Sequence, residues 1–350
     1  MSTASRCTRF VAVLSAAVLT TGLLLVGIAA PPALAASGSV PVRGTVGLYG
    51  VSCPSATKCF AVGELQQPGT IRGAMVTVTS GHASSPKLVS AANGLYGISC
   101  TSATNCYAVG FNNLADGEVV HFAGATQSSF AVPVVDSFTG VACVSATLCY
   151  AVGTEHNKKG TVVVTISNNR VTRTKIAPKL GLPEGIACHV GGSCVVVGGG
   201  IALIGGGPGT ALTLSHGTPG TPRSTKTNFF EGVACASATT CYAGASAGTA
   251  GVVVSLKGGV PGAVHEVVST SQLGAVACAN ATTCLAVGAL YGSSGSPHGA
   301  LVKLTKGVPG KATLSGPANF NAVSCHPSGL CVAVGTNNDM TQGYLVALKI

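Results

Sequence analysis

Fourteen of the fifteen cysteines form seven pairs with one internal spacing, C-x5-C, and the pairs recur every 43 to 47 residues. They are Cys53/Cys59, Cys100/Cys106, Cys143/Cys149, Cys188/Cys194, Cys235/Cys241, Cys278/Cys284 and Cys325/Cys331. Paired cysteines form disulfides or bind zinc. Structural zinc usually takes pairs separated by two to four residues, with a second pair or histidines close by, so the spacing here favours seven disulfides. No thiol of these pairs would then remain as a nucleophile or redox centre.

Two carboxylates form the second group with possible chemistry. Glu184 and Glu231 each stand four residues before a cysteine, at the same position of adjacent repeats. Carboxylates that lie close together can act as general acid and base, because repulsion separates their pKa values. The alternative, that both are solvated or bonded to backbone amides, is preferred because no arginine cluster or histidine accompanies them. We therefore predict no catalytic residue, with this pair as the alternative.

The fixed period predicts a repeat architecture, in which a unit too small to bury its own apolar face stacks on its neighbours. A complete unit contains four short apolar runs, exemplified by residues 48–53, 60–63 and 75–78 of the first unit and 130–132 of the second. Short apolar runs bounded by turn residues are typical of buried strands. Four β-rich runs in about 45 residues correspond to one propeller blade. The predicted fold is therefore all-β, a seven-bladed β-propeller with four strands per blade.

The last unit lacks its fourth run, because the sequence ends at Ile350, just after the third. Residues 39–43, which precede the first unit, have the composition of a strand. We expect this segment to supply the missing outer strand of the seventh blade, where Pro41 is acceptable because the outermost strand is an edge. Such a pairing would close the ring and argues against an open solenoid.

A variable position in the first run of each unit is the candidate ligand site. Small residues follow it in every repeat, as expected of an innermost strand where blades converge. The variable residues are Tyr49, Tyr96, Thr139, Glu184, Glu231, Gly274 and Asn321. A position that changes its chemistry from blade to blade on a constant scaffold is where ligand binding is expected. We predict ligand binding by all of them except the glycine.

The loops after the second run should open on the same face, and they offer oxygen atoms. Asn112, Asn113, Asp116 and residues 337–339 could coordinate calcium. Asparagine and aspartate are also ordinary turn residues, which is the preferred interpretation. The eight histidines occupy unrelated positions of the repeat. We therefore predict neither a metal site nor a cofactor.

The amino terminus has the pattern of a Sec-type secretory signal: Arg6 and Arg9, an apolar stretch over residues 10–30, and a small-residue cleavage site at 33–35. A retained membrane anchor is the alternative. We predict a signal peptide over residues 1–35, a single propeller domain over 36–350, and no membrane span after cleavage. Removal of Cys7 would leave an even number of cysteines, as expected of a secreted protein.

Charge excludes one class of partner. The formal net charge of +10 is spread over a chain in which only 8% of the residues are charged. Nucleic-acid sites normally need a clustered basic stripe, so we expect no nucleic-acid partner. A mildly basic surface could still rest on an anionic cell wall or membrane.

The succession of an apolar strand, a short turn, a [FYVL]-A-V-G motif and another apolar strand resembles the BNR-like, YVTN-like and photosystem-assembly-factor-like propeller repeats of secreted bacterial proteins. The resemblance covers residues 39–350 and implies architecture more than function. Sialidases share related repeats, but stretches such as residues 79–82 and 256–259 lack the Asp and Trp of the sialidase box.

These observations favour a secreted, monomeric, non-catalytic binding or scaffold module. Its partner would be a polysaccharide such as a cell-wall glycan, a peptide or a surface protein, bound at the channel mouth and adjoining loops. The alternative is a glycan-active hydrolase or lyase that uses Glu184 and Glu231. A purely structural, protease-resistant shell is a third possibility.

Overall fold

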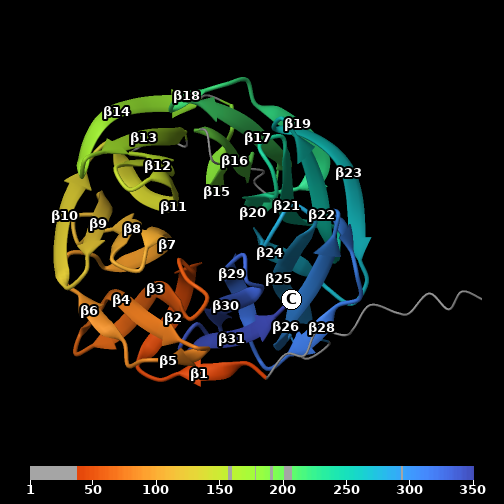
Figure 1. Ribbon diagram of the computed structural model, residues 1–350, viewed down its shortest axis with the longest axis horizontal. Coiled ribbons are helices and arrows are strands. Elements are labelled where there is room, and N and C mark those ends of the chain that lie inside the picture. Colours follow the sequence, from red (N-terminus) through yellow and green to blue (C-terminus); the bar gives the residue numbers. More distant parts are fainter. Residues whose placement is uncertain (1–37, 157–159, 178, 190–191, 201–206, 293–294) are drawn as a thin grey trace, which may run out of the picture. The chain divides into compact units, whose positions relative to one another are not determined.

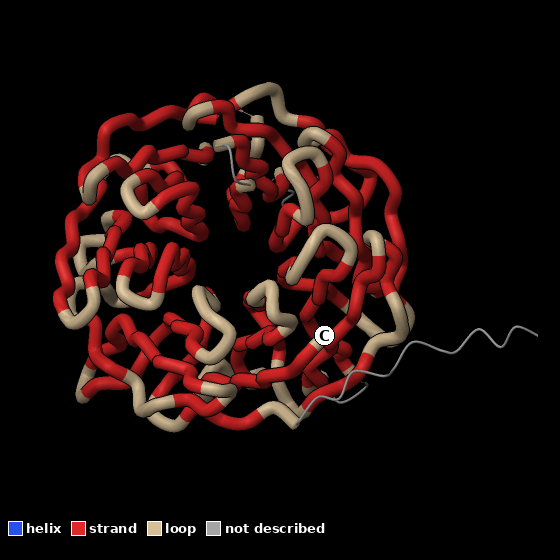
Figure 2. The backbone as a smooth tube through the Cα atoms, in the orientation of Figure 1, coloured by secondary structure: helices blue, strands red, loops and turns tan. Residues whose placement is uncertain are grey.

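The computed structural model describes residues 38–156, 160–177, 179–189, 192–200, 207–292 and 295–350. These residues form seven antiparallel sheets arranged in a ring around a central channel (Figure 1). Strands and loops account for all of the described backbone, as the tube in Figure 2 shows. In the described part of the chain, no helix could span a bilayer. The predicted signal sequence lies outside the described residues.

Each sheet is one blade, and in blades 1 to 6 the strands follow one another in sequence order from the channel to the rim. The innermost strands are β2 (Thr45–Ser52), β7 (Gly94–Ser102), β11 (Val135–Ser145), β15 (Leu182–Cys188), β20 (Phe230–Cys235), β24 (Gln272–Cys278) and β29 (Asn319–Cys325). The second strands are β3 (Lys58–Gln67), β8 (Asn105–Phe111), β12 (Leu148–Glu155), β16 (Ser193–Gly199), β21 (Thr240–Ala247), β25 (Thr283–Tyr291) and β30 (Leu330–Thr336). The third strands are β4 (Thr70–Thr79), β9 (Gly117–Ala123), β13 (Thr161–Ser167), β17 (Pro208–Ser215), β22 (Ala250–Lys257), β26 (Pro297–Thr305) and β31 (Gly343–Lys349).

The outer strands are less regular than the inner three. Single outer strands are β10 (Thr126–Val132), β14 (Arg170–Ala177) and β23 (Val260–Val267). In blades 1, 4 and 6 the outer position is divided between two short strands: β5 (His82–Ala83) and β6 (Lys87–Val89), β18 (Thr218–Pro219) and β19 (Arg223–Asn228), and β27 (Val308–Pro309) and β28 (Thr313–Ser315). Four strand positions per blade, as predicted, are therefore confirmed.

The amino-terminal strand β1 (Val40–Val42) closes the ring, which confirms the prediction made for residues 39–43. It pairs with β31 in register, Val40 opposite Leu345 and Val42 opposite Gly343. Val42 is buried, and its carbonyl oxygen accepts hydrogen bonds from the Thr45 hydroxyl and the Gln342 side-chain amide. The seventh blade thus combines the two ends of the propeller (Figure 1).

The hydrophobic core lies between the blades. Seven clusters of buried residues occur, one at each interface between neighbouring sheets. Valine and leucine dominate them. At about 1.5–3 kcal/mol for each fully buried aliphatic side chain, these interfaces are the main source of stability. The repeats therefore stabilise one another, as the period of the sequence predicts.

All seven predicted disulfides are present. They are Cys53–Cys59, Cys100–Cys106, Cys143–Cys149, Cys188–Cys194, Cys235–Cys241, Cys278–Cys284 and Cys325–Cys331. Each joins the end of the innermost strand to the start of the second strand, with Cα atoms 3.8–4.0 Å apart. Seven disulfides indicate an oxidising, extracellular type of environment, because such bonds are rare in reducing compartments.

The two cysteines of a pair differ in burial, a difference that the sequence analysis did not address. The second cysteines are core residues, at most 3% exposed, and each belongs to a different one of the seven clusters: Cys59, Cys106, Cys149, Cys194, Cys241, Cys284 and Cys331. The first cysteines are more exposed, and only Cys53 among them is buried. The physical reason is position, because the second strand is covered by neighbouring blades on both faces, whereas the first cysteine ends the strand beside the channel. The second cysteine therefore packs as a small hydrophobic residue as well as forming the disulfide.

Candidate functional site at the channel mouth

In every blade the variable position is the extra residue of a β-bulge. The pairing between innermost and second strand skips one residue, as between Leu48 and Gly50 or between Phe230 and Gly232. The skipped residues are Tyr49, Tyr96, Thr139, Glu184, Glu231, Gly274 and Asn321. Because a bulge bends the strand and redirects a side chain, it can turn this position out of the blade and toward the channel.

The glycine that ends the [FYVL]-A-V-G motif accommodates the bulge. In six blades this glycine lies opposite the residue before the bulge, as Gly63 lies opposite Leu48. A Cβ atom at Gly63 would overlap the backbone carbonyl of Gly47, and one at Gly110 would overlap that of Gly94. The motif is therefore a steric requirement of the bulged strand. In blade 5, Ala245 takes the equivalent place and Gly244 precedes it.

The seven bulged residues line one cavity of about 340 Å³ at the channel mouth. Gln272 and Phe320 complete its wall. The structure thus brings together every residue of the predicted ligand site, together with Gly274. Side chains from all seven blades face a common space large enough for a small group of a ligand.

A second space adjoins the cavity in the channel and shares the bulged residues with it. This space of about 150 Å³ is also lined by a ring of small residues, such as Gly50 and Gly97, and by a ring of aliphatic residues, such as Val51 and Ile98. A Cβ atom at Gly50 would lie 3.0 Å from the backbone oxygen of Tyr96 in the next blade. The small residues are therefore required by the close approach of neighbouring blades, as the repeat consensus suggests.

One side of the cavity is acidic. Glu184 and Glu231 come from the adjacent blades 4 and 5, and both are half-buried. Burial, with a contribution from the Glu231 charge, raises the pKa of Glu184 to about 7. Burial raises the pKa of Glu231 to about 7 as well. Both carboxyl groups therefore exchange protons near neutral pH.

The side formed by blades 1 and 2 is aromatic. The rings of Tyr49 and Tyr96 pack edge to face, with centroids 5.3 Å apart, and Tyr96 stacks on Phe111 at 5.8 Å. The Tyr96 hydroxyl donates a long hydrogen bond of 3.5 Å to Oε1 of Glu64. Burial and the Glu64 carboxylate raise the pKa of Tyr96 to about 12, and the same causes raise the pKa of Tyr49. Both tyrosines remain neutral at physiological pH.

Glu64 is not among the residues that line the cavity, but it supports the aromatic side, and the sequence analysis did not single it out. It lies on β3, one residue after the motif glycine, and contacts the tyrosine of the next blade. Burial raises the pKa of Glu64, although hydrogen bonds from Tyr96 and Tyr49 act in the opposite direction. The sequence does show that the position after the motif glycine varies from blade to blade. It is Glu64 in blade 1, Phe111 in blade 2 and Thr154 in blade 3.

The neutral polar residues of the cavity are already engaged. Thr139 donates its hydroxyl to the Val152 carbonyl at 3.4 Å. The Asn321 side-chain amide donates to the Leu48 carbonyl at 3.2 Å, which links blade 7 to blade 1. The Gln272 amide donates to Oδ1 of Asn319 at 3.2 Å. These residues shape the wall of the cavity. Among the described residues that line it, Glu184 and Glu231 are the carboxyl groups, and neither makes a hydrogen bond of this kind.

The asparagines of the adjoining loops are turn residues. Oδ1 of Asn112 accepts hydrogen bonds from the backbone N–H groups of Leu114 and Asp116. Oδ1 of Asn337 accepts in the same way from Thr341 and Gln342. These bonds occupy the oxygen atoms that calcium would need. Across the described ranges, no group of three or more His, Cys, Asp or Glu side chains is arranged to hold a metal ion.

Comparisons with known proteins show the fold. No protein-family model and no curated protein sequence matches the chain, so the resemblance to BNR-like and YVTN-like repeats stays a prediction. Many solved structures match. The WD40 β-propeller domain of Doa1 superposes with a TM-score of 0.62 at 9% identity, over 89% of this chain and 97% of that domain. The RRP9 WD40 repeats superpose with a TM-score of 0.66 at 12% sequence identity, over 91% of this chain and 99% of that one. The structure of U3-55K gives a TM-score of 0.65 at 11% identity, over 89% of this chain and 98% of that one. These likenesses identify the chain as a seven-bladed β-propeller.

Proposed function

We propose that this protein is a secreted, non-catalytic binding module that takes a group of its extracellular ligand into the cavity at the channel mouth. The observation that carries the proposal is the convergence of the seven bulged residues on one cavity of about 340 Å³. The innermost strands of the seven blades share their small and aliphatic positions and differ in chemistry at this one, as expected where a constant scaffold supports a specific site.

Secretion is supported by two independent features. Seven disulfides require an oxidising compartment to form and persist. The first 35 residues have the charged, apolar and small-residue regions of a secretory signal. The propeller is therefore expected to act outside the cytoplasm, at or beyond a cell surface, where polysaccharides, peptides and surface proteins are the available ligands.

Binding can be tested with the oxidised protein that begins at residue 36. We expect saturable, dose-dependent retention by a glycan array, a peptide array or immobilised cell-wall material. The substitutions Tyr49→Ala and Tyr96→Ala together should weaken this retention at least tenfold without unfolding the protein. Retention that these substitutions leave unchanged would place the ligand site elsewhere on the propeller.

Glycan hydrolysis is a second candidate, supported by one observation. A general acid must hold its proton near neutral pH, and burial raises the pKa of both Glu184 and Glu231 to about 7. The double substitution Glu184→Gln and Glu231→Gln separates the candidates. Product release from a bound glycan that this variant loses supports the enzyme. A wild-type protein that binds a glycan without cleaving it supports the binding module.

A further inference from the structure

The acidic side of the cavity lacks a counter-charge. Among the described residues, Glu184 and Glu231 have no hydrogen-bond or ion-pair partner, and the ion pair of His156 with Asp136 lies outside the cavity lining. No lysine, arginine or histidine is among the described residues that line the cavity, although the chain carries a formal net charge of +10. Two half-buried carboxyl groups without a cationic partner in the described part of the protein favour a cation that is supplied from outside.

The aromatic side suits the same partner. Tyrosine faces attract cations through the ring quadrupole and also pack against alkyl chains. The stacking of Tyr96 on Phe111 and the hydrogen bond to Glu64 hold this ring in place. Glu64 adds a further acidic group behind the tyrosines. A positively charged group with an apolar stem would find attraction on both sides of the channel.

The remaining polar groups distinguish an amine from a sugar. A sugar needs several hydrogen-bonding partners for its hydroxyls. The Thr139 hydroxyl and one N–H of each of the Gln272 and Asn321 side-chain amides already donate hydrogen bonds to protein oxygen atoms, which leaves one N–H on each amide. The wall therefore offers a sugar few free donors, whereas an ammonium group donates three hydrogen bonds and needs only acceptors. Glu184 and Glu231 supply such acceptors.

From this arrangement we infer that the cavity binds the protonated side chain of a lysine presented by an extended peptide, with its ammonium group at Glu184 and Glu231 and its alkyl stem along Tyr49 and Tyr96. The inference rests on the proposed function and names the ligand chemistry of the same site. It assigns the two glutamates to recognition and not to proton transfer with a substrate.

Binding of this kind depends on pH in a defined direction. The groups that face the bound ammonium are Glu184 on β15, Glu231 on β20 and the neutral tyrosines, and Tyr291 at the end of β25 lies near Glu231. Burial raises the pKa of both glutamates to about 7. An ammonium ion favours their charged forms, so affinity should rise about tenfold from pH 5.5 to pH 8, with proton release on binding.

The test is isothermal titration of the oxidised protein with the peptide acetyl-Gly-Ser-Lys-Ser-Gly-amide at about 0.15 M salt. A matched peptide with acetylated lysine removes the charge and retains the alkyl stem. The chitosan trimer and its N-acetylated form provide the same comparison for sugars, since the first carries amino groups and the second does not. The proteins are the wild type, the cavity variant Glu184→Gln/Glu231→Gln, and a control, Glu266→Gln, which removes a carboxylate at an exposed site on the outer strand β23, away from the cavity.

We expect saturable binding of the lysine peptide by the wild type and the control. Acetylation of the lysine should weaken binding of the peptide at least tenfold. The substitutions of the cavity variant should weaken binding of the unmodified peptide by at least the same factor. Equal binding by wild type and cavity variant would overturn the inference, as would tighter binding of the chitosan trimer than of the peptide. Binding of neutral glycans that the cavity variant retains would overturn it while leaving the proposed function intact. Failure of every ligand on the arrays described above would instead count against the proposed function itself.

Discussion

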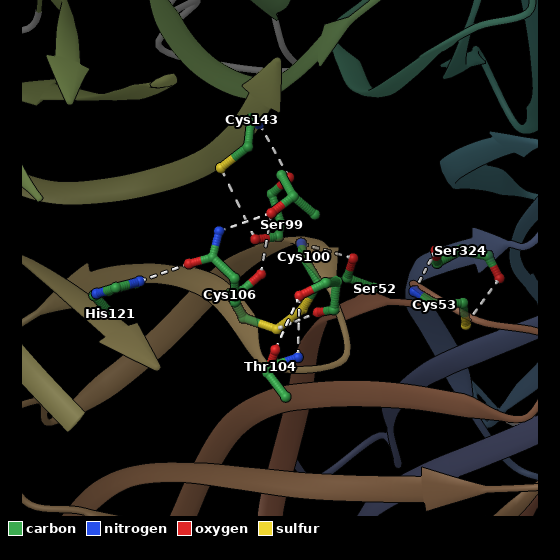
Figure 3. The surroundings of a disulfide bond; sticks show 12 residues. Ser52, Cys53, Ser99, Cys100, Thr104, Cys106, His121, Cys143 and Ser324 are labelled. Carbon is green, nitrogen blue, oxygen red and sulfur yellow. Dashed lines mark hydrogen bonds between the residues drawn. A yellow bond between two sulfur atoms is a disulfide. The ribbon is translucent and has the colours of Figure 1, made fainter. Parts of the chain in front are cut away.

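The side-chain hydroxyl of Ser99 accepts a hydrogen bond of 3.0 Å from the backbone N–H of Cys143 in the next blade (Figure 3). The same bond joins Ser52 to Cys100 and Ser324 to Cys53, each at 3.0 Å. Alanine occupies the equivalent position in the other four blades, at residues 142, 187, 234 and 277. Three interfaces, those between blades 7 and 1, 1 and 2, and 2 and 3, therefore carry a hydrogen bond beside the disulfides. In the other four interfaces alanine cannot accept this bond.

The first prediction concerns this bond. Ser99→Ala should reduce the free energy of unfolding by about 1 kcal/mol, the net value of one hydrogen bond. The reverse substitution, Ala187→Ser, should add up to about 1 kcal/mol, because the new hydroxyl would face the N–H of Cys235. Thermal unfolding monitored by circular dichroism measures both. If Ala187→Ser destabilises the protein, the blades differ in spacing at this level and the interpretation of the serine is wrong.

The second prediction concerns the disulfides. Replacing Cys143 and Cys149 by alanine should cost about 2 kcal/mol through the lost restriction of the unfolded chain, which is modest for a short closed loop. The buried second cysteine of each pair should also make reduction slow in the folded protein. Denaturant unfolding of the variant, and thiol release from the wild type with and without denaturant, measure the two effects. Rapid release of all thiols under native conditions would contradict the burial described for these cysteines.

The third prediction tests ring closure by β1. Deletion of residues 38–43 removes the buried Val42 side chain and the pairing with β31, and it should destabilise the propeller by about 3–5 kcal/mol. Val42→Ala should account for about 1–2 kcal/mol of this loss. The matched control is Val40→Ala, because Val40 is 50% exposed on the same strand and its substitution should have little effect. A deletion variant as stable as the wild type would show that the ring does not depend on this strand.

The fourth prediction is a pH dependence of stability. Because the pKa of Glu184 and of Glu231 rises from 4.5 to about 7 on folding, the folded state binds more protons than the unfolded state between these values. Stability should fall as the pH rises through this window and level off above it. A pKa shift of this size corresponds to a loss of roughly 3 kcal/mol in the free energy of unfolding for each glutamate. Because both side chains contact water in the cavity, we expect a loss of only about 1–2 kcal/mol for each.

The double variant Glu184→Gln/Glu231→Gln removes this dependence. It should match the wild type in stability near pH 4.5 and exceed it by about 2–4 kcal/mol above pH 7.5. Chemical unfolding at several pH values provides the comparison, with Glu266→Gln as an exposed control. Parallel stability curves for wild type and double variant would show that the cavity does not disfavour the charged carboxylates.

The architecture was predictable because it repeats. The period of the cysteine pairs predicts the number of blades, and the unmatched strand at residues 39–43 predicts the closure. The variable position predicts which residues meet at the channel mouth, since equivalent residues of a closed ring must converge. Each of these conclusions depends on a local pattern that recurs in every unit. The divided outer strands of blades 1, 4 and 6 were not predicted, because an exposed edge has no burial pattern to define it.

Contacts between blades were harder to derive. Glu64 reaches Tyr96 in the next blade, and Asn321 reaches Leu48 across the closure. These partners are 32 and 273 residues apart. Their pairing depends on the distance and rotation between blades, which the repeat alone does not specify. Blade 5 departs from the motif, with Gly244 and Ala245 where the other blades have valine and glycine, and the sequence shows this departure. The structure adds its consequence, because a Cβ atom at Gly244 would overlap the backbone carbonyl of Leu273 in the next blade.

The central claim is that the ligand enters the cavity at the channel mouth, and the variant Thr139→Trp tests it most directly. The larger side chain would fill much of the cavity, whereas Thr172→Trp makes the same change on the exposed outer strand of the same blade. Binding to peptide and glycan arrays should be lost in Thr139→Trp, at unchanged melting temperature, and kept in Thr172→Trp. Full binding by a folded Thr139→Trp protein would contradict the account.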